Sequence, residues 1–179
     1  AITADASGIY VAGCDRSLGP FNDSWRIEKR NLNTGALIAA FGTAGVVTEN
    51  LSTSSDIANA ITVGASGIYV AGYDAVQGNG EWRTEKSGLT AGNLICSHTN
   101  NPSTYFDIAY AITADASGIY VAGWDNSLGM SNTQWRIEKY DGVCLTSVEP
   151  LSHEDNIIFI YPNPCSGVFT IKMENSSPG

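Results

Sequence analysis

The stretch AITADASGIYVAG, from Ala1 to Gly13, occurs three times with few changes. It returns as AITVGASGIYVAG from Ala60 to Gly72 and unchanged from Ala111 to Gly123, so the copies begin 59 and 51 residues apart. Each copy is followed by WRIEK or WRTEK, which starts at Trp25, Trp82 and Trp135. Repeats of this length in strand-forming sequence are typical of stacked or radially arranged β units. The chain is therefore expected to be an all-β repeat protein.

Each copy predicts four short strands. The Ala-Ile-Thr segment leads into a turn that ends in Gly8, Gly67 or Gly118, and glycine supplies the positive φ that tight hairpins favour. The next strand, Ile-Tyr-Val-Ala-Gly, is apolar on both faces, as expected for a sheet between two neighbours. The third strand alternates, with Trp and Ile on one face and Arg and Glu on the other. Fourth strands are expected at Leu37–Ile38 with Val46–Val47 in the first copy and at Leu94–Ile95 in the second, whereas the third copy is shortened after Tyr140.

Six repeated residues are assigned structural roles. The three tryptophans share an apolar face with Ile, which places them in the cores of the repeats. The glycines that end the Ile-Tyr-Val-Ala-Gly strands are small enough to let adjacent sheets approach closely. The six are Trp25, Trp82, Trp135, Gly13, Gly72 and Gly123.

The first copy carries a family resemblance. Gly-x-Ile-Tyr-Val-Ala-Gly is followed by Trp-Arg-Ile-Glu-Lys and then by Phe41-Gly42-Thr43-Ala44-Gly45-Val46-Val47. This order of motifs resembles the delta-60 and related bacterial β-propeller repeats. The resemblance covers about residues 1–145 and implies three propeller blades, at 1–59, 60–110 and 111–145. The second and third copies lack the Phe-Gly-Thr-Ala-Gly-Val-Val segment.

Three blades are too few for a closed propeller, which typically has four to eight. Either identical chains associate, with a dimer completing a six-blade ring, or the chain is a fragment of a longer protein. An open array has exposed sheet faces and edges that favour self-association, so a homo-oligomer is expected. An open β-solenoid is the alternative architecture.

The C-terminal segment carries a second resemblance. Residues 146–155 are expected to be a linker, followed by a β-hairpin with strands at 156–161 and 168–173. The residues Tyr161, Pro162, Asn163, Pro164 and Gly167 resemble the start of the C-terminal sorting domain of the type IX secretion system of Bacteroidetes-type bacteria. Residues 156–179 span only part of that domain, so a truncated sorting-domain fragment is expected. The resemblance implies export and a secreted or surface-displayed protein.

The composition excludes some partners. The net charge is −9 and Lys and Arg together number only 9, which argues against nucleic acid or an anionic membrane surface as a partner. No run of about 18 apolar residues is present, so membrane insertion is not expected. The cysteines form no CxxC pair, so a zinc site or a thioredoxin-type motif is unsupported. The four cysteines are Cys14, Cys96, Cys144 and Cys165. Two states are compatible with the sequence: a disulfide between Cys144 and Cys165, or buried free thiols.

Catalytic groups are scarce. The only histidines, His98 and His153, lie outside the repeated segments and are expected in a solvated loop and in the linker. Glu28, Glu85 and Glu138 recur in every copy, which favours structural pairing with the arginines two residues earlier over glycosidase chemistry. The sequence therefore predicts a protein that is not an enzyme and has no cofactor.

Four residues are candidates for ligand binding. Asp15, Asp74 and Asp125 follow the second strand of each copy, where a carboxylate either binds Ca²⁺ or a sugar hydroxyl or caps a turn through its own backbone. Turn capping is favoured, because a Ca²⁺ site requires several acids and only Asp15 has another nearby, Asp23. Trp124 occurs in one copy only and is the candidate platform for stacking on a sugar.

Together these features predict a binding or scaffolding module. Specificity for a glycan or protein partner is expected in the variable loops, at 15–24, 74–81 and 125–134. One alternative is a self-assembling surface or filament subunit. The other is a non-catalytic part of a polysaccharide hydrolase or lyase.

Overall fold

The computed structural model describes residues 1–144 and the backbone of 158–161 and 170–173. All regular structure in these residues is β-strand, as the repeats predict, and it includes no helix that would cross a membrane. The chain divides into two units, 1–148 and 149–179. The strands are β1 (Ile2–Asp5), β2 (Gly8–Asp15), β3 (Ser24–Arg30), β4 (Val46–Glu49), β5 (Ile57–Gly64), β6 (Gly67–Asp74), β7 (Glu81–Ser87), β8 (Leu94–Asn100), β9 (Ile108–Asp115), β10 (Gly118–Asp125), β11 (Gln134–Tyr140), β12 (Ile158–Tyr161) and β13 (Thr170–Met173).

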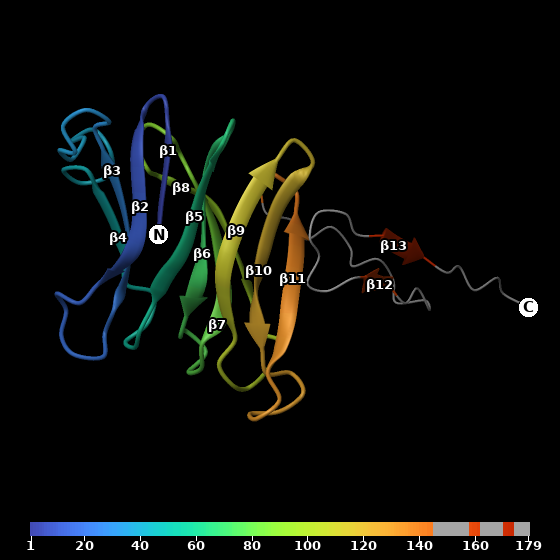
Figure 1. Cartoon of the computed structure of the whole chain (residues 1–179). Coiled ribbons are helices and arrows are strands. Elements are labelled where there is room, and N and C mark those ends of the chain that lie inside the picture. The colour runs from blue at the N-terminus through green and yellow to red at the C-terminus, as the bar shows by residue number, and fades with distance from the viewer. Residues whose placement is uncertain (145–157, 162–169, 174–179) are drawn as a thin grey trace, which may run out of the picture. The chain divides into compact units, whose positions relative to one another are not determined.

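The first unit contains three antiparallel sheets, one for each repeat (Figure 1). The strands of each sheet follow chain order, β1 to β4 in the first sheet, β5 to β8 in the second and β9 to β11 in the third. Four strands per repeat are thus confirmed for the first two sheets, and the third has three strands in the described part of the chain. The first strands of the sheets, β1, β5 and β9, are neighbours. Strands β5 and β9 begin three residues before the repeat boundaries at 60 and 111.

The end of the first repeat differs in part from the prediction. Val46–Glu49 pairs with β3, but Leu37 makes only an isolated bridge to that strand. Between them Phe41 is buried, and the Gly42 N–H donates at 2.9 Å to the carbonyl of Ala91, in the turn between β7 and β8 of the second repeat. The first residues of the Phe-Gly-Thr-Ala-Gly-Val-Val segment therefore contact the neighbouring repeat, and its last two residues begin strand β4.

Each sheet has two chemically different faces, because alternate residues of a strand point to opposite sides. We call them the Trp face and the Arg face. The Trp faces carry Tyr10, Ala12, Trp25, Ile27 and Lys29 in the first sheet, Tyr69, Ala71, Trp82, Thr84 and Lys86 in the second, and Tyr120, Ala122, Trp135, Ile137 and Lys139 in the third. The Arg faces carry Ile9, Val11, Arg26 and Glu28; Ile68, Val70, Arg83 and Glu85; and Ile119, Val121, Arg136 and Glu138.

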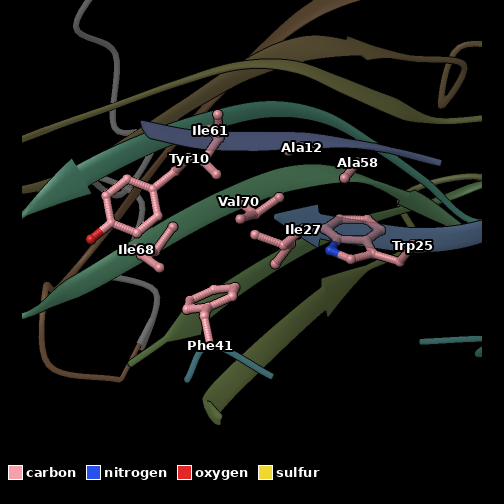
Figure 2. Close-up of a cluster of buried hydrophobic side chains, with 9 residues drawn as sticks. All are labelled: Tyr10, Ala12, Trp25, Ile27, Phe41, Ala58, Ile61, Ile68 and Val70. Atoms are coloured by element: carbon pink, nitrogen blue, oxygen red, sulfur yellow. The ribbon is translucent and has the colours of Figure 1, made fainter. Parts of the chain in front are cut away.

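Consecutive sheets pack Trp face on Arg face. The first junction, drawn in Figure 2, buries Tyr10, Ala12, Trp25, Ile27, Phe41, Ala58, Ile61, Ile68 and Val70. The second junction buries Tyr69, Ala71, Trp82, Ala109, Ile119, Val121 and Tyr140. Each large apolar side chain that is fully buried contributes about 1.5–3 kcal/mol. The hydrophobic core of the first unit therefore lies between its sheets.

A lysine at the end of the Trp face reaches across each junction. Lys29 Nζ donates to the Leu89 carbonyl and Lys86 Nζ to the Gly142 carbonyl, both at 2.7 Å. Each amine also lies near the ring of a tyrosine on its own face. In both cases the acceptor belongs to the following repeat. Leu89 lies three residues after Lys86, and Gly142 lies three residues after Lys139. The two junctions thus repeat one polar contact as well as one apolar one.

In the described residues of the second unit β12 pairs antiparallel with β13, with Ile158 opposite Met173 and Tyr161 opposite Thr170. These strands lie within the two strands expected at 156–161 and 168–173, of which the structure describes 158–161 and 170–173. Of the proposed sorting motif, Tyr161 is the last residue of β12. The expected linker 146–155 and the motif residues Pro162, Asn163, Pro164 and Gly167 lie outside the described residues.

Candidate functional site

The three candidate aspartates hold the loops that follow β2, β6 and β10. One carboxylate oxygen of each accepts the backbone N–H two residues further on, and the other accepts a guanidinium N–H from the adjacent strand. The backbone donors are Ser17, Val76 and Ser127, at 2.7, 3.0 and 2.9 Å. The guanidinium donors are Arg26 at 2.7 Å and Arg83 and Arg136 at 3.4 Å. This is the turn-capping arrangement, and a ligand-binding role for Asp15, Asp74 and Asp125 stays a prediction.

Each of these arginines also binds the glutamate two residues further along its strand. The Nε to Oε1 distances are 2.9 Å for Arg26–Glu28, 2.6 Å for Arg83–Glu85 and 2.5 Å for Arg136–Glu138. The structural pairing expected for the three glutamates is therefore present. In the second sheet the group is buried, and burial raises the pKa of Glu85 to about 7 although Arg83 opposes the shift.

Trp124 lies opposite Trp135 on the Trp face of the third sheet. Its half-buried ring is 6.4 Å from the ring of the exposed Tyr110, measured between centroids. Its carbonyl accepts a 3.0 Å hydrogen bond from the Trp82 indole. The two rings form an aromatic pair that solvent reaches in part, and the role of Trp124 as a sugar platform stays a prediction.

The three repeated tryptophans do not share one environment. Trp25 and Trp82 are 0% and 1% exposed, as expected of core residues, but Trp135 is 87% exposed. The expectation of a core position is therefore wrong for Trp135. The physical reason is that no further sheet covers the Trp face of the third sheet in the described residues, and Ile137 on the same face is 69% exposed.

The three repeated glycines also differ. A Cβ on Gly72 would lie 1.9 Å from the Ile57 carbonyl oxygen, and one on Gly123 would lie 2.1 Å from the Ile108 oxygen. Both contacts are within a sheet, at a β-bulge of the first strand. At Gly123 the preceding sheet also approaches closely, as predicted, because the ring of Trp82 would lie 2.9 Å from an added Cβ. A Cβ on Gly13 would meet nothing within 4 Å.

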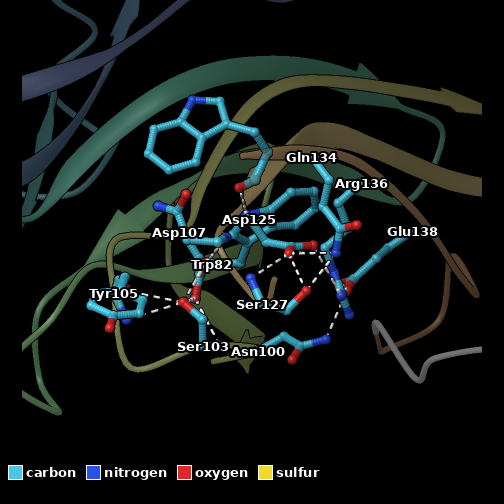
Figure 3. A network of polar contacts seen from close by, with 12 residues as sticks. Trp82, Asn100, Ser103, Tyr105, Asp107, Asp125, Ser127, Gln134, Arg136 and Glu138 are labelled. Carbon is cyan, nitrogen blue, oxygen red and sulfur yellow. Dashed lines mark hydrogen bonds and ion pairs between the residues drawn. The ribbon is translucent and has the colours of Figure 1, made fainter. Parts of the chain in front are cut away.

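Two buried aspartates that the repeated motifs did not point to lie in the connections between consecutive sheets, and each binds the loop after the second strand of the sheet that follows. Asp107 accepts hydrogen bonds from the Ser103 hydroxyl, before β9, and from the Asn126 N–H, in the β10–β11 loop (Figure 3). The corresponding contacts of Asp56 are with Ser52 and Ala75. The sequence signal is Ser-Thr-x-x-Asp, repeated at 52–56 and 103–107.

The loops after β2, β6 and β10 lie at one edge of the sheets, the lower edge in Figure 1. We call this edge, made of loops 16–23, 75–80 and 126–133 and the connection 101–107, the loop edge. Phe21 there is 82% exposed and has a φ of 68°, a left-handed conformation that is uncommon for a residue with a side chain. The large apolar side chains exposed on the loop edge are Leu18, Phe21, Val76, Tyr105, Phe106, Leu128 and Met130.

Polar contacts between and within the loops hold the loop edge. Asn79 Nδ2 donates to the carbonyls of Ser103 and Tyr105, at 3.2 and 2.6 Å. Arg16 and Asp23 form a 2.6 Å ion pair across the first loop. A surface that is already ordered loses less conformational entropy when it binds a partner. The loop edge thus presents exposed apolar groups on an ordered polar frame.

A metal-binding cluster is not found in the part of the chain that the structure describes. No three His, Cys, Asp or Glu side chains there gather closely enough to hold a metal ion. His98, expected in a loop, lies instead on β8 with its ring 5.0 Å from that of Tyr140. His153 lies outside the described residues.

The described cysteines are not fully buried thiols. Cys14 and Cys144 are exposed and Cys96 is half-buried. Burial raises the pKa of Cys96 to about 12, and a contact with the thiol of Cys144 adds to the shift. The alternative Cys144–Cys165 pairing falls outside the described residues.

A shallow hollow of about 390 Å³ lies at the opposite edge, between the second and third sheets. It is lined by the hairpin turns at 64–67 and 115–118 and by residues 141–143. The Asp115 carboxylate in its wall accepts a 2.7 Å hydrogen bond from the Ser117 hydroxyl, so this acid serves its own turn.

Polar and apolar groups thus divide by location. The Asp-Arg-Glu groups and the connecting aspartates are occupied by contacts within the protein, whereas the loop edge and the Trp face of the third sheet expose apolar side chains. These two surfaces are the candidate binding sites. No protein-family model, curated protein or solved structure matches the chain.

Proposed function

We propose that the chain is a secreted or surface-displayed β-propeller-type module that binds a partner and is not an enzyme. The loop edge is the observation that carries the proposal. Three loops from similar repeats and the connection 101–107, held by buried aspartates, together expose seven large apolar side chains at one edge of the sheets. Exposed apolar groups gathered on an ordered surface are typical of interaction sites.

The propeller architecture is supported by the arrangement of the strands. Each sheet is a meander, consecutive sheets pack face to face, and the first strands β1, β5 and β9 are neighbours. Blades arranged around an axis have these properties. Export is supported by the resemblance of Tyr161-Pro162-Asn163-Pro164 and Gly167 to a type IX sorting signal.

The side chains of the loop edge favour a protein partner over a glycan. Four of the seven exposed residues are aliphatic or carry a thioether, and such groups bury against the apolar side chains of another protein. A glycan would instead stack on an aromatic ring such as Trp124. The proposal therefore places a protein or peptide on the loop edge and keeps a glycan as the second arm of the test.

Peptide-display panning and a glycan array test both arms with the full chain. The loop variant Phe21→Ser/Met130→Ser is compared with the control Leu94→Ser/Ile95→Ser, which removes two exposed apolar side chains of β8. We expect a peptide family that binds the wild type and the control but not the loop variant. Equal binding by all three proteins, or no ligand in either format, would overturn the proposal. Glycan binding that Trp124→Ala abolishes would replace the protein partner by a sugar.

Self-assembly is a second candidate function, because Trp135 and Ile137 lie exposed on a sheet face that nothing covers in the described residues. The two functions use different surfaces. The loop edge lies across the strand ends, whereas the Trp face lies on the side of a sheet. A partner on one surface leaves the other free.

A further inference from the structure

The two end faces of the array complement each other, and we propose that the Trp face of the third sheet binds the Arg face of the first sheet in a second copy of the chain. The reciprocal contact closes a dimer of six sheets. Inside one chain, a Trp face already packs on an Arg face twice. The third Trp face and the first Arg face are the two that have no sheet against them in the described residues.

The exposed Trp face has the same five residue types as the buried Trp face of the first sheet, and the second sheet differs from both only in having Thr84 in place of Ile. The first carries Tyr10, Ala12, Trp25, Ile27 and Lys29, and the third differs only in position, with Tyr120, Ala122, Trp135, Ile137 and Lys139. The first is buried in the first junction, whereas Trp135 and Ile137 are exposed. Removing this aromatic and aliphatic surface from water is the main driving force that we expect for docking.

The Arg face of the first sheet is open at the position where a partner's tryptophan would lie. In the second junction the ring of Trp82 lies 2.9 Å from the position of a Cβ on Gly123. Gly13 occupies the equivalent position of the first sheet, and a Cβ there would meet nothing within 4 Å. The space over Gly13 is therefore where the partner's Trp135 is expected to lie.

The charged groups of the two faces also match. Arg136 lies 5.8 Å from the centroid of the Trp82 ring across the second junction, measured from its guanidinium carbon. Arg26 is the equivalent arginine of the first sheet and is partly exposed. Docking places it against the partner's Trp135, where a cation–π contact adds to apolar burial.

The lysine contact repeats as well. Lys139 is exposed and lies 5.4 Å from the centroid of the Tyr120 ring, much as Lys86 lies 5.7 Å from that of Tyr69. In both internal junctions the acceptor carbonyl lies three residues after the equivalent lysine of the sheet being contacted, at Leu89 after Lys86 and at Gly142 after Lys139. In the first sheet that carbonyl belongs to Leu32. Lys139 is therefore expected to donate to the carbonyl of the partner's Leu32.

Head-to-tail docking is favoured over contact between two Trp faces. Only the head-to-tail contact reproduces the apolar, arginine and lysine contacts of both internal junctions. A contact between unlike surfaces is heterologous, and it closes into a ring only when both ends of each chain engage. Six blades lie within the range that closed propellers use.

The solution mass of the full chain tests the proposal, measured by light scattering after size exclusion over roughly three decades of concentration. We expect a species of twice the 18.9 kDa chain mass that dissociates on dilution. Trp135→Ser is expected to weaken association at least tenfold, as truncation of a central interface tryptophan does. Lys139→Glu is a second variant of the same face. Leu128→Ser removes an exposed apolar side chain of the loop edge and is expected to keep the wild-type mass.

Mixing two variants fixes the orientation. Gly13→Leu places a bulky side chain on the Arg face and leaves the Trp face intact, whereas Trp135→Ser alters the Trp face and leaves the Arg face intact. Each variant alone is expected to be a monomer, and an equimolar mixture is expected to form a heterodimer through the one intact pair of faces. Circular dichroism and thermal melting verify that both variants remain folded.

Three results would overturn the proposal. A wild-type chain that stays monomeric over the whole range shows that the faces do not bind. A Gly13→Leu variant that still dimerises shows that Trp faces pair with each other. A mixture that fails to associate, although the wild type does, shows that dimerisation uses another surface.

Discussion

Asp74 and Glu81 lie directly opposite each other on β6 and β7, and both carboxyl groups are buried, with exposed fractions of 0% and 2%. Burial, followed by the charge of Asp74, raises the pKa of Glu81 to about 7. In the third sheet the same two positions hold Asp125 and Gln134, and the Gln134 amide donates to Asp125 at 2.9 Å. Glu81 takes the place of an amide donor and can donate to Asp74 only when it is protonated.

Glu81→Gln is therefore expected to remove a pH-dependent loss of stability. The folded-state pKa of Glu81 lies above the value of about 4.5 for an unfolded chain, so its contribution is complete below pH 4.5 and is lost as the pH rises through 7. Relative to the variant, the wild type should lose roughly 2–3 kcal/mol of unfolding free energy between pH 4.5 and 8.

Urea unfolding at a series of pH values measures this difference. Glu85, whose pKa is raised in the same direction, is present in both proteins and does not affect the comparison. Parallel stability curves for the two proteins across this pH range would show that Glu81 does not hold a proton in the folded state.

Gly72→Ala is expected to lower the unfolding free energy by about 2 kcal/mol or more, because the new Cβ would overlap the Ile57 carbonyl and force the β-bulge to shift. Gly13→Ala is the matched control, since its Cβ meets nothing within 4 Å. The control should change stability by less than about 1 kcal/mol, in the stabilising direction. Chemical denaturation at a concentration where the chain is monomeric measures both, and equal effects would contradict the assignment.

Arg83→Met is expected to cost about 3–5 kcal/mol, because it leaves Asp74 and Glu85 buried without their cation. Arg26→Met makes the same change in the first sheet, where the arginine is partly exposed. It should cost no more than about 1 kcal/mol. Thermal or urea unfolding of dilute chains compares the two. If Arg26→Met lowers the unfolding free energy as much as Arg83→Met does, the burial of the arginine does not determine how much the ion pairs contribute.

Cys96 is expected to react with iodoacetamide more slowly than Cys14 at pH 8. Its pKa of about 12 leaves on the order of one thiolate in ten thousand at that pH, and the side chain is half-buried. Peptide mass spectrometry after timed quenching gives the modification rate at each position. If Cys96 is labelled as fast as in an unfolded control in urea, the folded environment does not protect it.

The sequence predicted those features that depend on alternation and repetition. Trp25 alternates with Arg26 and Glu28, and this pattern correctly gave the strand, its two faces and the structural use of the glutamate. Turn glycines and the offsets between copies gave the number of sheets. Such features depend on residues close together in the chain, so the pattern of the sequence is enough to predict them.

Features that depend on neighbouring sheets could not be predicted in the same way. Trp135 has the same local sequence as Trp25, and only the absence of a covering sheet in the described residues makes it exposed. The burial of Glu81 opposite Asp74 also requires knowledge of strand register. Asp56 and Asp107 lie before the first strand of their sheets, and their bonds to the loop after the second strand appear only once the sheet is folded.

Because each sheet has one Trp face and one Arg face, the order of the sheets has a direction, and every junction presents the same pair of surfaces. Gain or loss of one whole repeat therefore creates no new kind of contact, because the two repeats that become neighbours again pack Trp face on Arg face. Unequal recombination between near-identical repeats would change the length of such an array without requiring compensating substitutions. The number of repeats is thus a property that evolution can alter in single steps, while the loops of each repeat diverge independently.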